Sequence, residues 1–231
     1  MAYVKRIVCL ANSFKIGGAC IAGREILSNG SYGGWIRPVS ARPTAEVSFL
    51  ESRYPDNTVP KLLDIVDIPM VKAVPHNHQT ENHEIDPTKR WVKRGEFPWA
   101  SLSALAEHPT SLWINSDSTS NGTFNCMSDA EAASLNTSLV LLKKQSFTVE
   151  VGSKTWEGRT TKTYRGNFKY KGTPYSFSLT DPVATNVFAS KDEGEYPFTD
   201  VYICVSLTEP WKKDNNRCHK LVASLITNPP F

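Results

Sequence analysis

The sequence predicts an all-β protein. Short runs of apolar and β-branched residues recur along the 231-residue chain, and glycine pairs such as Gly17-Gly18 and Gly33-Gly34 separate them. The last third contains five such runs, with a longer connection after the third run. Five short strands in that arrangement are the strand count of an OB-fold, while an SH3-like barrel or a PUA-like β fold would leave a similar pattern.

Four strands are predicted in the first third of the chain, each from a run of apolar or β-branched residues. They are Val4–Ala11, Ala19–Leu27, Trp35–Ser40 and the longer run Leu62–Val74. Pro69 lies inside the last run. Because proline has no N–H to donate to a strand ladder, it predicts an edge or a bulge at that point.

The middle of the chain has a different character. Pro75–Pro98 is polar and shows no clean period, whereas Trp99–His108 has apolar residues at helical spacing. Ser128 and Glu131 fit a capping box, which predicts the start of a second short helix. We therefore expect residues 76–138 to form an insert of loops and short helices.

Strand patterns return in the last third of the chain. The five predicted strands are Leu139–Val151, Thr163–Tyr170, Tyr175–Thr180, Val201–Leu207 and Lys220–Ile226. The segment Lys171–Pro174 (KGTP) has the composition of a hairpin turn between the second and third of these strands.

Positive charge is concentrated toward the C-terminal end. Residues 1–138 carry 13 basic and 14 acidic side chains, and residues 139–231 carry 13 basic and 9 acidic ones. Between Lys143 and Phe177, basic residues are interleaved with aromatic rings. A single nucleic-acid strand needs cations for its phosphates and flat rings for its bases, so this segment predicts single-stranded DNA or RNA as the partner.

A first pair of candidate contacts lies on a predicted strand of the first third. Trp35 and Arg37 alternate with Ile36, so they point to the same face, where they could stack a base and bind a phosphate. In the competing interpretation Trp35 belongs to the core. Arg37 then pairs with Asp64 or Asp67 and holds the sheet together.

A second group of candidate contacts lies on the basic and aromatic strands of the last third. It comprises Lys162, Tyr164, Arg165, Phe168, Lys169, Tyr170 and Lys171. Alternation places Lys162 and the three aromatic residues on one face and the other three cations on the opposite face. If the aromatic face is the interior of a barrel, those cations form only a solvated exterior.

The sequence contains no recognised catalytic motif. There is no G-x-S-x-G, no Walker A run and no G-x-G-x-x-G. Asp181 and Glu209 each follow a predicted strand, where a turn or capping role is expected. We therefore expect a non-enzymatic binding module without a cofactor. The alternative is a protein-interaction or small-ligand sensing module that does not bind nucleic acid.

Three histidines are the weak candidates for a metal site. His76, His78 and His83 lie in the polar segment PHNHQTENH, and H-x-H on a strand can direct two imidazoles to one side. A metal-dependent hydrolase that uses them is a third interpretation. Loops rich in histidine are common without metal, so no metal is predicted.

The cysteines and the hydropathy pattern bear on the compartment. The five cysteines are widely spaced and include no C-x-x-C, which argues against a disulfide framework or a zinc ribbon. The apolar run Ile7–Ala11 is shorter than a signal-peptide core. No segment approaches the roughly 20 apolar residues needed to cross a bilayer. We expect a cytoplasmic protein with no membrane partner.

Short motifs occur in order along nearly the whole chain. They are Arg6–Ser13 followed by Gly17-Gly18, Gly33–Ser40 (GGWIRPVS), Leu63–Ile65, Pro75-His76 with Gln79 and Glu81-Asn82, Ser111–Asn115, Thr180–Pro182, Val205–Leu207 with Glu209-Pro210, and Lys220–Ala223. With these motifs the chain resembles the dual OB-fold domain proteins of bacteria and their mobile elements.

The resemblance implies two small OB-like β-barrels, residues 1–75 and 139–231, joined by the loop and short-helix insert 76–138. It also implies a defence or mobile-element setting, with nucleic acid and other proteins as partners. No reaction is established for that family, so the resemblance carries no catalytic residues to this chain.

Overall fold

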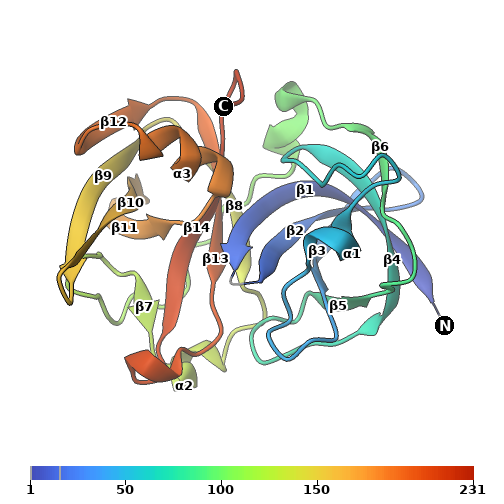
Figure 1. Cartoon of the computed structure of the whole chain (residues 1–231), viewed down its shortest axis with the longest axis horizontal. Coiled ribbons are helices and arrows are strands. Elements are labelled where there is room, and N and C mark those ends of the chain that lie inside the picture. Colours follow the sequence, from blue (N-terminus) through green and yellow to red (C-terminus); the bar gives the residue numbers. More distant parts are fainter. Residues whose placement is uncertain (1, 16) are drawn as a thin grey trace. The chain divides into compact units, whose positions relative to one another are not determined.

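The fold is mostly β and divides into two compact units. The computed structural model describes residues 2–15 and 17–231, with every side chain of that set except those of Lys15 and Trp156. The units are Met1–Leu105 and Ala106–Phe231, and each is built around one sheet (Figure 1). The prediction of an all-β fold is therefore confirmed. No helix in the described part of the chain is long and apolar enough to span a membrane.

The first unit contains one sheet with two short helices. Its elements are β1 (Tyr3–Lys15), β2 (Gly18–Ile26), β3 (Tyr32–Val39), α1 (Phe49–Ser52), β4 (Asp64–Ala73), β5 (Asn82–Ile85), β6 (Val92–Glu96) and the 3₁₀ helix η1 (Trp99–Ala104). The strand order is β1-β2-β3-β5-β4-β6, and β1 also pairs with β4. The path of strands therefore closes on itself through β1.

β1 closes this path because it is long enough to pair along both edges. Its first part, Tyr3–Val8, is antiparallel to β4, and its second part, Ile7–Lys15, is antiparallel to β2. Ile7 packs with Ile36 of β3 and Val66 of β4 in one buried apolar cluster. The sequence pattern located this strand, and the pairing on two edges extends it at both ends.

Pro69 lies where β4 changes its partner. On one edge of β4, Asp64–Asp67 pair with β6, and the pairing with β5 begins at Met70. The carbonyl of Pro69 accepts from the N–H of Asp86 at 2.9 Å, so this edge is the one that lacks an N–H at Pro69. The irregularity predicted from the proline therefore occurs at the junction between two partner strands.

The second unit contains a larger sheet with three short helices. Its elements are β7 (Cys126–Met127), α2 (Asp129–Ala132), β8 (Leu139–Lys144), β9 (Phe147–Trp156), β10 (Arg159–Tyr170), β11 (Thr173–Leu179), α3 (Pro182–Ala189), β12 (Gly194–Phe198), β13 (Val201–Leu207), the 3₁₀ helix η2 (Lys212–Asp214) and β14 (Cys218–Ile226). The strand order is β12-β9-β10-β11-β14-β13-β8, and β7 pairs with β14.

Two long strands of this sheet are each interrupted once. Gln145 and Ser146 separate β8 from β9, and Thr199 and Asp200 separate β12 from β13. β9 pairs with β10 and β12, whereas β8 pairs with β13. If β8 and β9 are counted as one strand, that strand pairs with β10, the second strand of the unit, and with β12 and β13, which together form the fourth. The path of strands in the second unit therefore closes as in the first.

A parallel pairing joins the third and fifth strands in each unit. In the first unit Arg37–Val39 of β3 lie beside Asn82–Glu84 of β5, and in the second Ser178-Leu179 of β11 lie beside Leu221-Val222 of β14. Parallel neighbours require a long connection between them. In both units that connection contains a helix and the fourth strand, so the two sheets share one topology.

Residues 76–138, predicted as an insert, are shared between the units. β5 and β6 join the first sheet, whereas β7 joins the second. The reason is burial: Ile85 and Trp91 lie in the core of the first unit, and Leu112 and Met127 lie in apolar clusters of the second. Because the segment is mostly polar, these few buried apolar residues did not produce a recognisable strand pattern.

The two helices predicted in this segment both exist in shorter form. Ser128 and Glu131 form the predicted capping box, and α2 ends at Ala132. The predicted amphipathic helix at Trp99–His108 is the 3₁₀ helix η1, which buries Leu102 and Leu105. Two 3₁₀ turns and the residue that follows them are therefore sufficient to bury both leucines.

Asp181 connects α3 to the sheet of the second unit. One carboxylate oxygen accepts from the N–H groups of Val183 (2.9 Å) and Ala184 (3.1 Å), which caps the helix. The other accepts from the N–H of Leu225 in β14 at 3.0 Å. The side chain is 1 % exposed, and burial raises its pKa. The capping role expected for this residue is confirmed.

We expect Asp181→Ala to lower the free energy of unfolding by roughly 2 kcal/mol, because a helix cap and a buried acceptor for β14 are lost together. Asp181→Asn keeps one carbonyl oxygen and should lose less. Chemical denaturation of both variants tests this expectation. Equal stability of Asp181→Ala and the wild type would show that the three hydrogen bonds contribute nothing net.

Candidate nucleic-acid interface

Trp35 and Arg37 of the first unit are both buried. Ile36 points into the core, and its two neighbours lie on the opposite face of β3 with 9 % and 8 % of their surface exposed. The guanidinium of Arg37 lies 3.3 Å from Glu81 Oε1, and its backbone N–H donates to the Glu81 carbonyl at 2.8 Å. Arg37 is therefore a buried, ion-paired residue on the face of β3 opposite the core.

The partner of Arg37 differs from both carboxylates that the sequence offered. Asp64 accepts from Tyr54 Oη at 2.9 Å and lies 2.6 Å from Lys93 Nζ. Asp67 binds Arg6 and Arg94 at 2.6 and 2.7 Å. The parallel pairing of β3 with β5 brings Glu81 beside Arg37, and no local sequence pattern encodes that pairing.

β10 separates its aromatic residues from most of its cations, as alternation predicted. Phe168 points inward, is 6 % exposed, and stacks on Tyr175 with ring centroids 5.6 Å apart. Arg165 lies on the outer face, where its guanidinium donates to the Ser176 carbonyl (2.5 Å) and hydroxyl (2.9 Å). The barrel interior is therefore the aromatic face, and Phe168 has no face open to a base.

Lys162 holds the end of a helix. Its ammonium donates to the carbonyls of Ala189 (2.8 Å) and Lys191 (2.5 Å), at the C-terminus of α3. Those carbonyls lack partners within the helix, and a cation there also offsets the negative end of the helix dipole. The sequence could not show this contact, because 27 residues separate Lys162 from Ala189.

The β10–β11 turn gathers the remaining candidates. Tyr170 packs on the core of the unit and donates its hydroxyl to the Pro109 carbonyl at 2.6 Å. Lys171 is exposed, and its ammonium lies 5.7 Å from the centre of the Tyr170 ring. Lys169 is also exposed. We call Lys144, Lys169, Tyr170 and Lys171 the turn cluster.

Lys144 joins this cluster from β8 and was absent from the predicted contacts. Its ammonium donates to the Lys169 carbonyl and lies 5.7 Å from the ring centres of both Phe168 and Tyr170. Burial lowers its pKa. The sequence signal was the pair Lys143-Lys144, but only the return of β10 to β8 places one of them beside Tyr170. Tyr164, by contrast, packs against the core of the unit.

The three histidines are not gathered. His78 is 1 % exposed, whereas His76 is exposed. His83 Nδ1 lies 2.6 Å from the hydroxyl of Tyr3, and burial lowers the pKa of this imidazole. Within residues 2–15 and 17–231, no three His, Cys, Asp or Glu side chains come close enough together to hold a metal ion.

The boundary between the units changes the charge balance. Residues 1–105 carry 13 basic and 10 acidic side chains, a net charge of +3, and residues 106–231 carry 13 of each, a net charge of zero. The four acidic residues of 106–138 belong to the second unit and offset the excess counted in 139–231. Any attraction of an anion to the second unit must therefore come from local clusters of charge.

Lys220 is a buried lysine of β14 that the predictions did not include. Its side chain is 0 % exposed and donates to the carbonyl of Ile114 (2.8 Å) and to Asn115 Oδ1 (2.9 Å). Burial lowers the pKa of Lys220 to about 7. A neutral amine has two N–H groups, which match these two acceptors. Lys220 therefore ties the segment before β7 to the sheet.

Comparison with known families agrees with the topology of the two sheets. The family model of the dual OB-containing domain matches residues 5–225, which include every strand except the ends of β1 and β14. This chain belongs to the dual OB-containing domain family. The dual OB match spans both units. No curated protein and no solved structure matches the chain.

Membership of the dual OB family fixes the architecture but not the ligand, because one fold hosts many unrelated functions. The ligand has to be inferred from exposed side chains. In this dual OB protein the buried candidates Trp35, Arg37 and Phe168 contribute to the folded structure, and the turn cluster carries exposed cations.

We expect Arg37→Met to destabilise the first unit by about 3 kcal/mol or more, because it leaves Glu81 buried without its cation. Arg94→Met is the matched control. Arg94 is half exposed and Asp67 keeps Arg6, so the loss should stay below about 1 kcal/mol. Denaturant unfolding followed by fluorescence measures both. Equal, small losses would contradict the buried ion pair.

The pKa of Lys220 predicts a pH dependence of stability. Because the folded value is about 7 and the unfolded value is about 10.4, the unfolded chain binds the extra proton between these pH values. Stability should therefore rise with pH from about 7 to about 10, by at most about 1.4 kcal/mol per pH unit from this group. Lys220→Met should remove that rise. The same slope in both proteins would contradict the assignment.

Proposed function

We propose that this dual OB protein is a non-enzymatic module that binds single-stranded nucleic acid through its second unit. The observation that carries the proposal is the turn cluster, where exposed Lys169 and Lys171 flank Tyr170. Cations beside an aromatic ring provide both kinds of contact that a single strand requires.

The position of the cluster supports this proposal. β10 and β11 are the second and third strands of their unit, and in OB-folds the face of these strands contacts oligonucleotides. The outer face of β10 carries polar side chains next to Lys169. Asn167 donates to Glu150 at 2.7 Å, and Arg165 donates to Ser176. Such groups can hydrogen-bond a sugar–phosphate backbone if their present hydrogen bonds within the protein break.

The proposed contacts are narrower than the set predicted from the sequence. Lys169 and Lys171 bind phosphates, half-buried Tyr170 contacts a base, and Arg165 assists from the outer face. Lys162 is engaged at the end of α3, so we assign it no phosphate. We place the protein among binding modules because its sequence contains none of the catalytic motifs considered above. We further propose a cytoplasmic setting in a defence or mobile-element system, with protein partners.

Fluorescence anisotropy with labelled single-stranded DNA, single-stranded RNA and duplex tests the proposal. We expect binding that prefers single strands and weakens steeply with salt. Lys169→Ala/Lys171→Ala should reduce the slope of log affinity against log salt by about 1.4, which corresponds to two phosphate contacts on a single strand.

Lys61→Ala/Lys191→Ala is the matched control. It removes two exposed lysines outside the turn cluster and should leave the slope nearly unchanged. An unchanged slope in the Lys169/Lys171 variant would remove the turn cluster from the interface. No binding of the wild type to any of the three nucleic acids at low salt would overturn the proposed function and favour a protein or small-molecule ligand.

A further inference from the structure

The loop that connects β13 to β14 exposes a tryptophan between structured strands. Residues 208–217 form this loop, and Trp211 is 54 % exposed. Tryptophan side chains usually stabilise a fold by burying apolar surface, and an indole with this exposure contributes little of that stabilisation. In the sequence, Trp211 directly precedes two lysines, Lys212 and Lys213.

Two lysines follow the tryptophan directly. Lys212 and Lys213 are exposed in η2, and neither makes an ion pair with a carboxylate in the described part of the chain. The second unit as a whole is neutral, so this pair of cations is a local positive site and not part of a general excess. An exposed ring next to two cations without carboxylate partners matches the requirements of a stacked base with adjacent phosphates.

The loop is held in one conformation by its own hydrogen bonds. The N–H of Trp211 donates to the Arg217 carbonyl at 3.0 Å, and the Trp211 carbonyl accepts from Asp214 (2.9 Å) and Asn216 (3.1 Å). Arg217 pairs with Asp214 at 2.6 Å and with Asp117 at 2.8 Å. Trp211 is therefore presented on a preorganised loop, which lowers the ordering entropy that a ligand must overcome.

His219 supports one side of the indole and leaves a face open. The ring centres are 5.8 Å apart and the planes cross at 71°, so the imidazole meets the indole edge to face and does not cover it. His219 Nε2 lies 2.8 Å from Asp214 Oδ2 of the same loop. The uncovered indole surface faces solvent.

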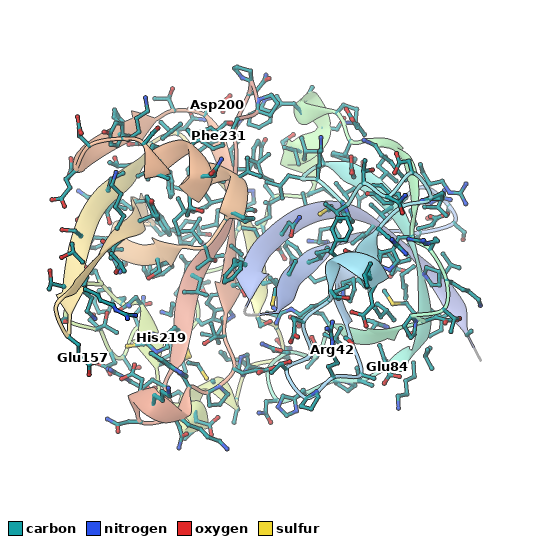
Figure 2. The ribbon with its side chains drawn as sticks, in the orientation of Figure 1. Arg42, Glu84, Glu157, Asp200, His219 and Phe231 are labelled. Atoms are coloured by element: carbon teal, nitrogen blue, oxygen red, sulfur yellow. The ribbon has the colours of Figure 1, made fainter. Side chains whose placement is uncertain are left out.

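The loop has the position that contacts ligands in other OB-folds. It connects the fourth and fifth strands of the unit, and such loops, together with the loop between the first and second strands, bind oligonucleotides and oligosaccharides. Figure 2 shows Glu157, in the turn between β9 and β10, and His219, at the start of β14, toward the same end of the second unit. Both loops therefore border one end of this sheet.

We propose that Trp211 is a stacking platform for a base of single-stranded nucleic acid and that Lys212 and Lys213 bind the phosphates beside that base. This inference rests on the proposed function and adds a second contact site to it. A neutral oligosaccharide would also stack on an indole, but it would leave both cations without a role. The anionic ligand is therefore the one that uses all three side chains.

The test uses the full chain and an oligothymidine of roughly 16 nucleotides, together with an abasic oligomer of the same length. Trp211→Ala should weaken oligothymidine binding about tenfold, whereas Trp211→Phe should retain most of it because phenylalanine still stacks. On the abasic oligomer, Trp211→Ala should bind like the wild type. Lys212→Ala/Lys213→Ala should lower the salt slope by about 1.4, unlike Lys61→Ala/Lys191→Ala.

A direct readout comes from protein labelled with 5-fluorotryptophan, in which the Trp211 resonance is assigned by its loss in Trp211→Phe. Addition of oligothymidine should shift or broaden that resonance. Binding by the wild type with no change at Trp211 and no loss in either variant would overturn this inference while the proposed function stands. No binding by the wild type would overturn both. If a neutral oligosaccharide shifts the Trp211 resonance and oligothymidine does not, the ligand of this loop is a sugar and this inference is wrong.

Discussion

Each unit is held together by a first strand that pairs along both of its edges. β1 does so with β2 and β4, and the interrupted strand β8–β9 does so with β10, β12 and β13. Closure occupies both edges of these first strands and creates an interior that apolar side chains must fill. Closure therefore decides which face of each strand lines the interior.

Closure also explains why the basic and aromatic residues of β10 do not act as one surface. Phe168 fills the interior with Tyr175, whereas Arg165 and Lys169 remain outside. At the β10–β11 turn and in the β13–β14 loop, exposed rings and cations come together because alternation no longer separates them beyond the end of a strand. The proposed contacts lie at two such positions. One is Tyr170 with Lys171 at the hairpin turn, and the other is Trp211 with Lys212 and Lys213 in the loop.

Buried polar side chains hold the connections onto the two sheets. Arg37 with Glu81 secures the entry into β5, Asp181 fixes α3 to β14, and Lys220 retains the segment before β7. Each is buried and binds a polar partner, as is usual for buried polar groups. These residues are polar because they hold irregular chain against a sheet, where backbone carbonyls and N–H groups need partners.

The sequence by itself determined much of the local structure: the strands other than β5, β6, β7 and β12, the Lys171-Gly172 hairpin turn, the Ser128 capping box, the irregularity at Pro69 and the opposite faces of Phe168 and Arg165. These depend on neighbouring residues and on alternation. Only the tertiary structure decided which face is interior, that Glu81 and not Asp64 or Asp67 pairs with Arg37, that Lys162 binds the end of α3, and that 106–138 neutralises the second unit. Those outcomes depend on strand pairings between residues far apart in the chain, which no local pattern encodes.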